Sequence, residues 1–276
     1  MRNDIFKRTF CKKCNFAFDQ HLKTCPKCNE ENDDFIEKRC RNPLFFLDLL
    51  RCLSILFGWM ILMYVVPFIV SLIVQAINPE LLKSMNLSLG LNLAVYIVGF
   101  ISFGRILWNY KKIIFKDFCK VRNLIVGLIA GVLLIGLSQL ISFLMYGLGG
   151  LPTNSNQLVV EDTVKNSAVL SFFVVVICGP IFEELVFRVG LMGLGMKFSE
   201  KYGKVWAYVI SIFVFIFIHL NFMGENINLI AEFAAIPSYF IGAAVLCLAY
   251  DLGGLSSSII AHIMNNLLGY ILVMVL

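Results

Sequence analysis

Ionisable side chains lie inside long apolar segments in the last third of the chain. Glu183, Glu184 and Arg188 share one such segment, and His219 and His262 lie in two later ones. An ionisable group at membrane depth is costly to bury, so each of these residues is a functional-site hypothesis. Two chemistries are open to them. A partly desolvated glutamate can act as a general base, or the glutamates and histidines can together hold a zinc ion with a bound hydroxide.

Helical spacing predicts how these side chains are arranged. Glu184 and Arg188 are four residues apart, so on a helix they are neighbours and can form an ion pair. Glu183 is rotated by about 100° from Glu184, so it can face a different cavity and is free to act as a base. His262 and Asn266 are also four residues apart, and their side chains should converge on one patch.

The predicted depths of these residues in the membrane agree with one another. Counted from the cytoplasmic boundaries at about 1.5 Å per residue, Glu183, His219 and Asn266 lie roughly 21 to 22 Å deep. His262 lies at about 16 Å on the same count. The four side chains are therefore expected in one layer.

The elements that must position this layer are transmembrane helices. The chain has 276 residues, of which 59% are hydrophobic and 15% are charged, with 25 Phe. Soluble domains are roughly 45–50% apolar and about 25% charged. A soluble enzyme, a disordered chain, collagen and a coiled coil are thus excluded, and an all-α polytopic membrane protein of about seven transmembrane helices is predicted. The predicted spans are 52–77, 87–108, 123–148, 167–196, 205–222, 230–250 and 255–276.

The distribution of basic residues predicts the orientation of these spans. Residues 1–51 hold 11 of the 23 Lys and Arg, and the predicted outer loops hold only Lys83 and Lys165. Positive residues stay on the cytoplasmic side of a membrane. The chain is therefore expected to be an integral membrane protein with a cytoplasmic N-terminus and an external C-terminus.

The N-terminal segment carries two CxxC pairs that are separated by ten residues. Four thiolates at this spacing suit a tetrahedral structural zinc site. Two disulfides or four free thiols are the alternatives, but the paired spacing and the basic flanks, which indicate the reducing cytosol, favour zinc. The segment resembles the zinc-ribbon heads of many bacterial membrane proteins. The predicted ligands are Cys11, Cys14, Cys25 and Cys28.

The difference between the charged, cysteine-containing N-terminal segment and the apolar remainder of the chain predicts two domains. Residues 1–40 are expected to form a cytoplasmic zinc ribbon and linker, and residues 41–276 a transmembrane helical domain. A segment as short as the first cannot bury enough core to fold alone, so the metal should supply most of its folding free energy.

Three motifs in the membrane domain together resemble a known family. EExxxR, FxxxH and HxxxN follow one another on successive hydrophobic helices. This set is similar to that of the CAAX protease and bacteriocin-processing (CPBP, also called ABI) family of intramembrane endopeptidases. The resemblance covers about residues 123–276 and leaves the N-terminal module outside. The matching residues are Glu183, Glu184, Arg188, Phe215, His219, His262 and Asn266.

The resemblance implies a role for each motif. Glu183 and His219 would activate the attacking water, His262 and Asn266 would stabilise the tetrahedral oxyanion, and the EExxxR ion pair would order the site. Amide hydrolysis needs a base of this kind. A donor pair facing the oxyanion is worth several kcal/mol in a site sheltered from water. A site without catalytic metal is favoured over a zinc protease, because there is no HExxH motif and Asn266 is a poor zinc ligand.

The expected function is therefore hydrolysis of a membrane-associated peptide or protein, near its cytoplasmic or mid-membrane portion. A non-catalytic immunity or scaffold protein and a transporter with a proton relay are the alternatives, and the intact set of motifs favours catalysis. The expected partners are the substrate, the lipid bilayer and a cytoplasmic protein that binds the zinc ribbon. The bilayer is expected to be a bacterial cell membrane. No nucleic-acid partner is expected. Glu232 is expected to be an interfacial carboxylate outside the site.

Overall fold

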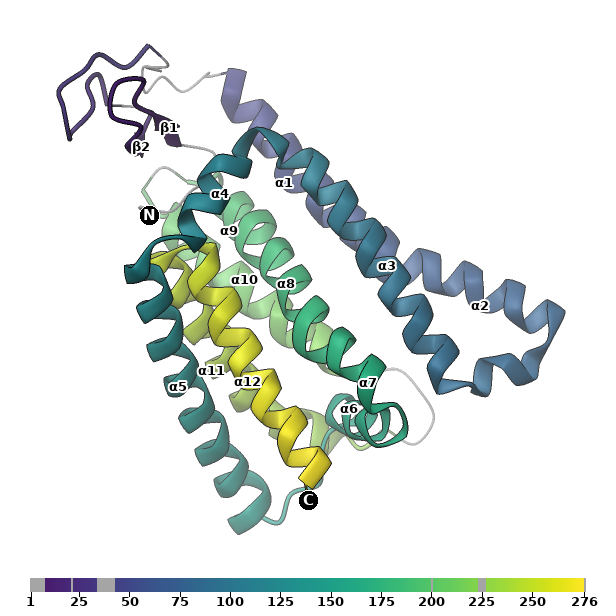
Figure 1. Cartoon of the computed structure of the whole chain (residues 1–276). Coiled ribbons are helices and arrows are strands. Elements are labelled where there is room, and N and C mark those ends of the chain that lie inside the picture. The colour runs from purple at the N-terminus through teal and green to yellow at the C-terminus, as the bar shows by residue number, and fades with distance from the viewer. Residues whose placement is uncertain (1–7, 21, 34–42, 200, 223–226, 276) are drawn as a thin grey trace.

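The computed structural model describes residues 8–20, 22–33, 43–199, 201–222 and 227–275. In this part of the chain a bundle of helices carries a small two-stranded module at one end (Figure 1). Six helices are long and apolar enough to cross a membrane, which confirms the predicted all-α polytopic class. They span Asp48–Ile77, Met85–Ile106, Val121–Leu148, Ala168–Gly195, Leu229–Gly253 and Leu255–Val275.

The fifth predicted span is shorter than expected. It forms the apolar helix α10, Gly203–His219, of 17 residues, where the sequence predicts 205–222. The helix ends because Leu220 adopts an extended backbone, with φ −102° and ψ 138°. His219 is therefore the last helical residue, and the segment that follows it departs from the helix axis.

Several spans consist of helical pieces joined in line. The first span joins α1 and α2 through a π-helical turn at Ile61–Val65, and the fourth joins α7, α8 and α9 through π-helical turns at Phe172–Cys178 and Leu185–Leu191. A π-helical turn shifts the facing of the residues beyond it and is frequent at functional sites. The bounds of the α-helices not yet given are α1 Pro43–Met60, α2 Val66–Ile77, α3 Met85–Ile106, α4 Lys111–Phe118, α5 Val121–Ser142, α6 Ser155–Asn166, α7 Ala168–Ser171, α8 Gly179–Glu184, α9 Met192–Gly195, α11 Leu229–Gly253 and α12 Leu255–Val275.

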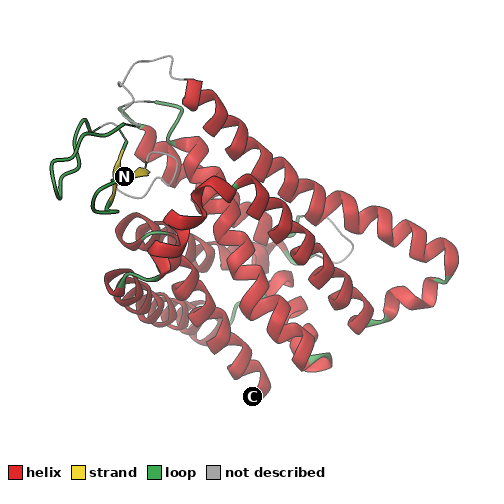
Figure 2. Ribbon diagram, turned by 45° about the horizontal axis from the view of Figure 1, so that its top comes forward, coloured by secondary structure: helices red, strands yellow, loops and turns green. Residues whose placement is uncertain are grey.

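Glycines let α5 approach α12 closely. A Cβ atom on Gly127 would lie 3.0 Å from both the Cβ of Ile260 and the backbone oxygen of Ser257, and one on Gly131 would lie 2.6 Å from the sulfur of Met264. Small residues four apart are a common means of close helix packing in membranes. Figure 2 shows the helices of the bundle from a second direction. This packing matters for function because α12 carries two of the predicted site residues.

The two ends of the bundle differ in charge. Lys116, Lys120, Arg122 and Lys204 lie beside the two-stranded module, around one cavity. The far end, where Figure 1 shows α6 and the end of α12, carries Lys165. This asymmetry agrees with the charge pattern used above, while the orientation of the chain in the membrane stays a prediction.

Candidate functional site

The residue before the two glutamates anchors this part of the fourth span to α3. The Phe182 ring stacks on the Phe103 ring, with centroids 4.9 Å apart, and its edge lies where a Cβ of Gly99 would be. Phe182 is almost fully buried. Because the side chain of Phe182 is fixed on the α3 side, the two carboxylates that follow it are directed toward the other helices of the bundle.

Glu184 belongs to a fully buried ionic network. Its carboxylate accepts hydrogen bonds from Arg188 Nε at 2.8 Å and Nη2 at 3.4 Å, and it faces Nδ1 of His262 at 3.0 Å. The guanidinium also donates to Ser211 Oγ at 2.6 Å and contacts Cys247 Sγ at 3.2 Å. The side chains of Glu184 and Arg188 are both 0% exposed. The expected ion pair is present, and it ties the fourth span to α10, α11 and α12.

Glu183 lines a cavity, and its Oε2 atom lacks a hydrogen-bond partner. Its Oε2 atom lies 3.8 Å from Nε2 of His262 and 4.0 Å from Nε2 of His219, too far for direct hydrogen bonds. Among the described residues, Glu183 Oε2 is one of two buried side-chain oxygen or nitrogen atoms with no partner. The second is Ser238 Oγ. Buried polar atoms are almost always paired in native proteins, so an unpaired carboxylate oxygen indicates a place where another molecule binds.

Each of the two histidines has a polar partner at Nδ1. Nδ1 of His219 lies 2.7 Å from the backbone oxygen of Phe215, to which it donates, and the two rings stack at 4.4 Å. Nδ1 of His262 faces Glu184, as described above. In both residues Nε2 is therefore the nitrogen directed toward Glu183.

Asn266 is oriented by the π-helical turn of the fourth span. Its Nδ2 donates to the backbone oxygen of Val175 at 3.0 Å, and its Oδ1 accepts from Nδ2 of Asn265 at 3.4 Å. An amide nitrogen carries two hydrogens. One N–H of Asn266 is therefore left for a ligand after the bond to Val175.

A cavity of about 730 Å³ connects these residues. Its lining includes Glu183, His219, His262 and Asn266, as well as Ser238. Both unpaired atoms thus belong to residues that line the same space. Most of the remaining lining comes from α5, α6, α11 and α12, including the end of α12 that lies away from the two-stranded module. With the predicted orientation, the cavity extends from the middle of the membrane toward the external side, whereas the sequence suggested cleavage near the cytoplasmic or mid-membrane portion of the substrate.

Two residues of α11 that the sequence did not assign to the site hold its far wall. The Tyr239 hydroxyl accepts hydrogen bonds from the side-chain amides of Asn154 and Asn156, each at 3.0 Å, and its ring lies 4.9 Å from that of His219. Asn156 belongs to α6. Tyr239 therefore links α6 to a histidine of the site.

Glu232 is the second of these residues, and it lies in the first turn of α11, where the sequence predicts an interfacial carboxylate. The side chain is only 1% exposed. It accepts from the backbone N–H and hydroxyl of Ser155 at the start of α6, and from the backbone N–H of Asn221 at 2.9 Å. Glu232 thus fastens both α6 and the segment after His219. Its partners lie 77 and 11 residues away in sequence, so no local pattern could have revealed them.

The four predicted metal ligands of the N-terminal module come together. The sulfur atoms of Cys11, Cys14, Cys25 and Cys28 all lie within 4.8 Å of one another. The Cys11–Cys28 and Cys14–Cys25 sulfur distances are 3.4 and 3.6 Å. Zinc–sulfur bonds of about 2.3 Å in a tetrahedron place the sulfurs about 3.8 Å apart, whereas a disulfide needs about 2.05 Å. The cluster therefore fits a metal and not a pair of disulfides.

The two CxxC turns have the same backbone design. In each, the residue after the second cysteine, Asn15 or Asn29, has a positive φ, of 54° and 56°. Each of these residues donates its N–H to the oxygen of the first cysteine, Cys11 or Cys25. Asparagine is one of the few residues that tolerate this conformation. The repeated turn brings the two thiol pairs together beside the strands β1, Arg8–Phe10, and β2, Ala17–Asp19.

The fold and site together define a polytopic membrane protein with a buried ionic network and an internal polar cavity. Residues 165–268 match the Rce1-like family, described as Type II CAAX prenyl endopeptidase Rce1-like. This segment contains all six predicted site residues of the membrane domain, and its match confirms the resemblance to a family of CAAX proteases. No curated protein and no solved structure matches the chain.

Proposed function

We propose that the chain is an intramembrane endopeptidase in which Glu183 activates water to cleave a membrane-associated peptide or protein. The observation that carries the proposal is the unpaired Oε2 of Glu183, which lies beside two histidine nitrogens at the wall of the 730 Å³ cavity. The family match supports a protease.

In the proposed reaction, a water molecule binds between Glu183 and Nε2 of His219. The 4.0 Å gap between these atoms is too long for a hydrogen bond but is short enough for one water to contact both. Nε2 of His219 can accept a hydrogen bond, because Nδ1 holds the proton that it donates to Phe215. Glu183 removes a proton as the water oxygen attacks the substrate carbonyl, and the proton then passes to the leaving amine.

His262 and Asn266 are the proposed donors to the oxyanion. Nδ1 of His262 donates to the buried carboxylate of Glu184, so Nε2 can donate as well only in the imidazolium form. With this form, Glu183, Glu184, Arg188 and His262 carry two negative and two positive charges. A balanced set of charges is the least costly arrangement in a buried site. The second N–H of Asn266 completes the donor pair.

The geometry supports a site without a catalytic metal over a zinc site. Among the described residues, the only cluster of three or more His, Cys, Asp or Glu ligand atoms within metal-binding distance is the cysteine cluster. The histidines and Glu183 do not form a second one. For the cysteine cluster itself we propose structural zinc, and we propose residues 1–40 and 41–276 as the two domains.

The proposed substrate enters the cavity from the end of the bundle that carries α6. The lining there is rich in amides and hydroxyls, including Asn154, Asn156, Gln157 and Tyr146. Such groups can hydrogen-bond an extended peptide backbone. This region is expected to hold the residues next to the scissile bond.

Two experiments test the proposal. Purified zinc-loaded protein in lipid nanodiscs is incubated with a farnesylated CAAX peptide, and products are identified by mass spectrometry. In parallel, N-termini of membrane proteins are compared between cells that carry the wild-type chain and cells that carry Glu183→Gln. Cleavage that requires Glu183 in either experiment supports the peptidase. A cellular phenotype that survives Glu183→Gln together with Asn266→Ala would show a function without hydrolysis. Loss of activity with o-phenanthroline while the cysteine cluster keeps its zinc would favour a metalloprotease.

A further inference from the structure

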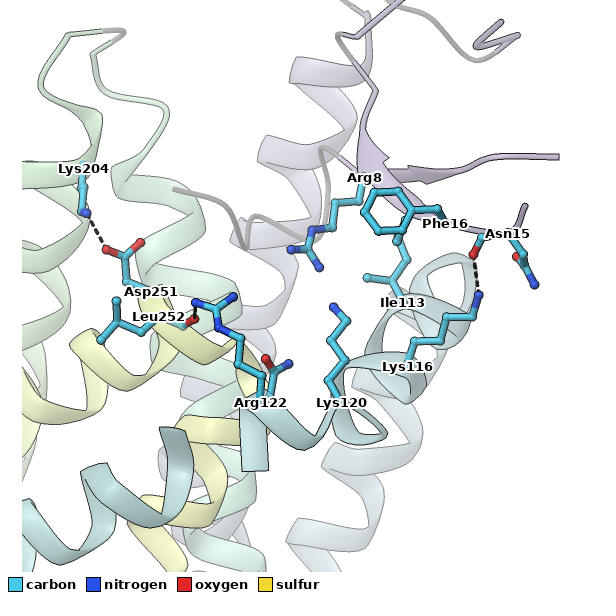
Figure 3. A pocket seen from close by; sticks show the side chains of 12 residues that line it. Arg8, Asn15, Phe16, Ile113, Lys116, Lys120, Arg122, Lys204, Asp251 and Leu252 are labelled. Carbon is cyan, nitrogen blue, oxygen red and sulfur yellow. Dashed lines mark hydrogen bonds and ion pairs between the residues drawn. The ribbon is translucent and has the colours of Figure 1, made fainter. Parts of the chain in front are cut away.

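A second cavity, of about 620 Å³, lies between the two-stranded module and the membrane domain. Five cationic residues line it, whereas Asp251 is its one acidic lining residue. Arg8 comes from β1, Lys116 from α4, Lys120 and Arg122 from the start of α5, and Lys204 from the start of α10 (Figure 3). The volume falls within the range of small-molecule sites, roughly 300–1,000 Å³.

The cavity exists because the module is docked on α4. Lys116 Nζ donates to the backbone oxygen of Asn15 at 2.8 Å and lies 4.4 Å from the centroid of the Phe10 ring. Asn15 is the residue whose positive φ shapes the first CxxC turn. Phe16 and Ala17, which follow it, form part of the cavity wall. Zinc binding and the shape of the cavity are therefore linked through the same turn.

The described residues that line the cavity include more cationic than acidic side chains. Lys204 forms an ion pair with Asp251, and Lys120 lies 3.7 Å from Asp117. Asp117 is also committed to Asn123 and Ser256. Arg122 donates to the backbone oxygen of Leu252, a neutral acceptor. The five cations and the two carboxylates, Asp251 and Asp117, together carry a net positive charge.

Arg8 and Lys120 face one another across the cavity (Figure 3). Partial burial and the positive charge of Arg8 lower the pKa of Lys120. Two like charges held together in this way repel each other, and an anion between them would convert the repulsion into attraction.

The position of the cavity indicates the source of the anion. Lys120 and Arg122 flank Val121, the first residue of a membrane-spanning segment, so the cavity lies at the level of lipid headgroups. Val121 is 68% exposed and Leu252 is 49% exposed, which provides apolar surface beside the charges. A phosphate with apolar chains attached matches this combination.

We infer that this cavity binds a phosphate group, supplied by the headgroup of an anionic phospholipid, and that the bound phosphate bridges the zinc module to the membrane domain. The site is separate from the proposed catalytic cavity, and it does not depend on the proposed hydrolysis. Free phosphate would present the same chemistry without the apolar chains.

The test uses the full zinc-loaded chain in neutral detergent, titrated with dihexanoyl phosphatidylglycerol, dihexanoyl phosphatidylcholine, inorganic phosphate and hexaglutamate. We expect the phosphatidylglycerol to bind most tightly. Arg8→Gln with Lys120→Gln should weaken its binding by about 30-fold, the effect of two cations near an anionic surface. The matched control, Lys83→Gln with Lys201→Gln, removes two cations that do not line the cavity and should leave binding unchanged.

A second variant guards against loss of folding. Ala17→Glu adds a carboxylate to the wall of the cavity and should also abolish binding, while Leu22→Glu places the same charge on an exposed position of the module outside the lining. Zinc content and thermal unfolding are measured for every variant. Inorganic phosphate that binds as tightly as the phosphatidylglycerol, with the same sensitivity to the variants, would support a phosphate site with a soluble source. Tightest binding of hexaglutamate, or binding unaffected by these variants in folded protein, would overturn the inference.

Discussion

Replacing either of the two adjacent glutamates by glutamine should have a different effect. The change at Glu183 should reduce cleavage, and the change at Glu184 should reduce stability. Glu183→Gln preserves the shape of the side chain and breaks no hydrogen bond at Oε2, because this atom has none. It removes the group that we propose accepts the proton from water. Cleavage should therefore fall by about 10²- to 10⁴-fold, the usual share of general acid–base catalysis, while the free energy of unfolding stays nearly constant.

Glu184→Gln removes a charge that three nitrogen atoms contact at 2.8 to 3.4 Å. It leaves the fully buried guanidinium of Arg188 without its counter-charge. Breaking a buried ion pair by neutralising one partner typically destabilises a protein by about 3–5 kcal/mol. The expected result is a marked fall in unfolding temperature and a loss of folded protein, with activity lost in proportion.

The assay measures both quantities on the same preparations. Peptide cleavage in nanodiscs reports activity, and tryptophan fluorescence during heating reports unfolding. Activity is expressed per folded molecule, so that instability and loss of chemistry are separated. The reasoning is refuted if Glu183→Gln retains more than about a tenth of the wild-type rate. It is equally refuted if the two variants unfold at the same temperature.

Three further predictions concern other parts of the chain. Purified protein should contain one zinc, which Cys11→Ser with Cys25→Ser removes and His219→Ala leaves in place; metal analysis by mass spectrometry decides this. Tyr239→Phe keeps the ring beside His219 but loses two hydrogen bonds from the α6 region, worth about 0.5–1.5 kcal/mol each, so KM should rise about 10-fold while kcat changes little. A protease-accessible tag before the first residue should be protected in intact cells and one after the last residue should be cleaved, and the reverse pattern would overturn the assigned orientation.

Much of the site could be predicted because it depends on helical periodicity. The separation of Glu183 from Glu184 follows from the rotation between consecutive residues of a helix, and the Glu184–Arg188 pair follows from the four-residue spacing. Counting residues from the membrane boundary placed the histidines at similar depths. The structure brings Glu183 within 4.0 Å of both.

What the sequence did not reveal depends on contacts between distant segments. Ser155 and Glu232 meet across 77 residues, and Asn154 and Tyr239 across 85. The polar segment that becomes α6 has no apolar face long enough to predict where it packs. The early end of α10 also escaped prediction, because an apolar run continues past His219 while the backbone does not remain helical.

The order of the site residues along the chain has a consequence for the synthesis and membrane insertion of the protein. Arg188 follows Glu184 within one helical turn, so this pair can form as soon as the fourth span is made and enters the membrane without net charge from the pair. His262 joins the same carboxylate only 78 residues later, in the last helix. At about 5–20 residues per second this interval lasts roughly 4 to 16 s. During synthesis the nascent chain therefore holds the proposed base before the proposed oxyanion donors, so the proposed site is complete only once the last helix has been made.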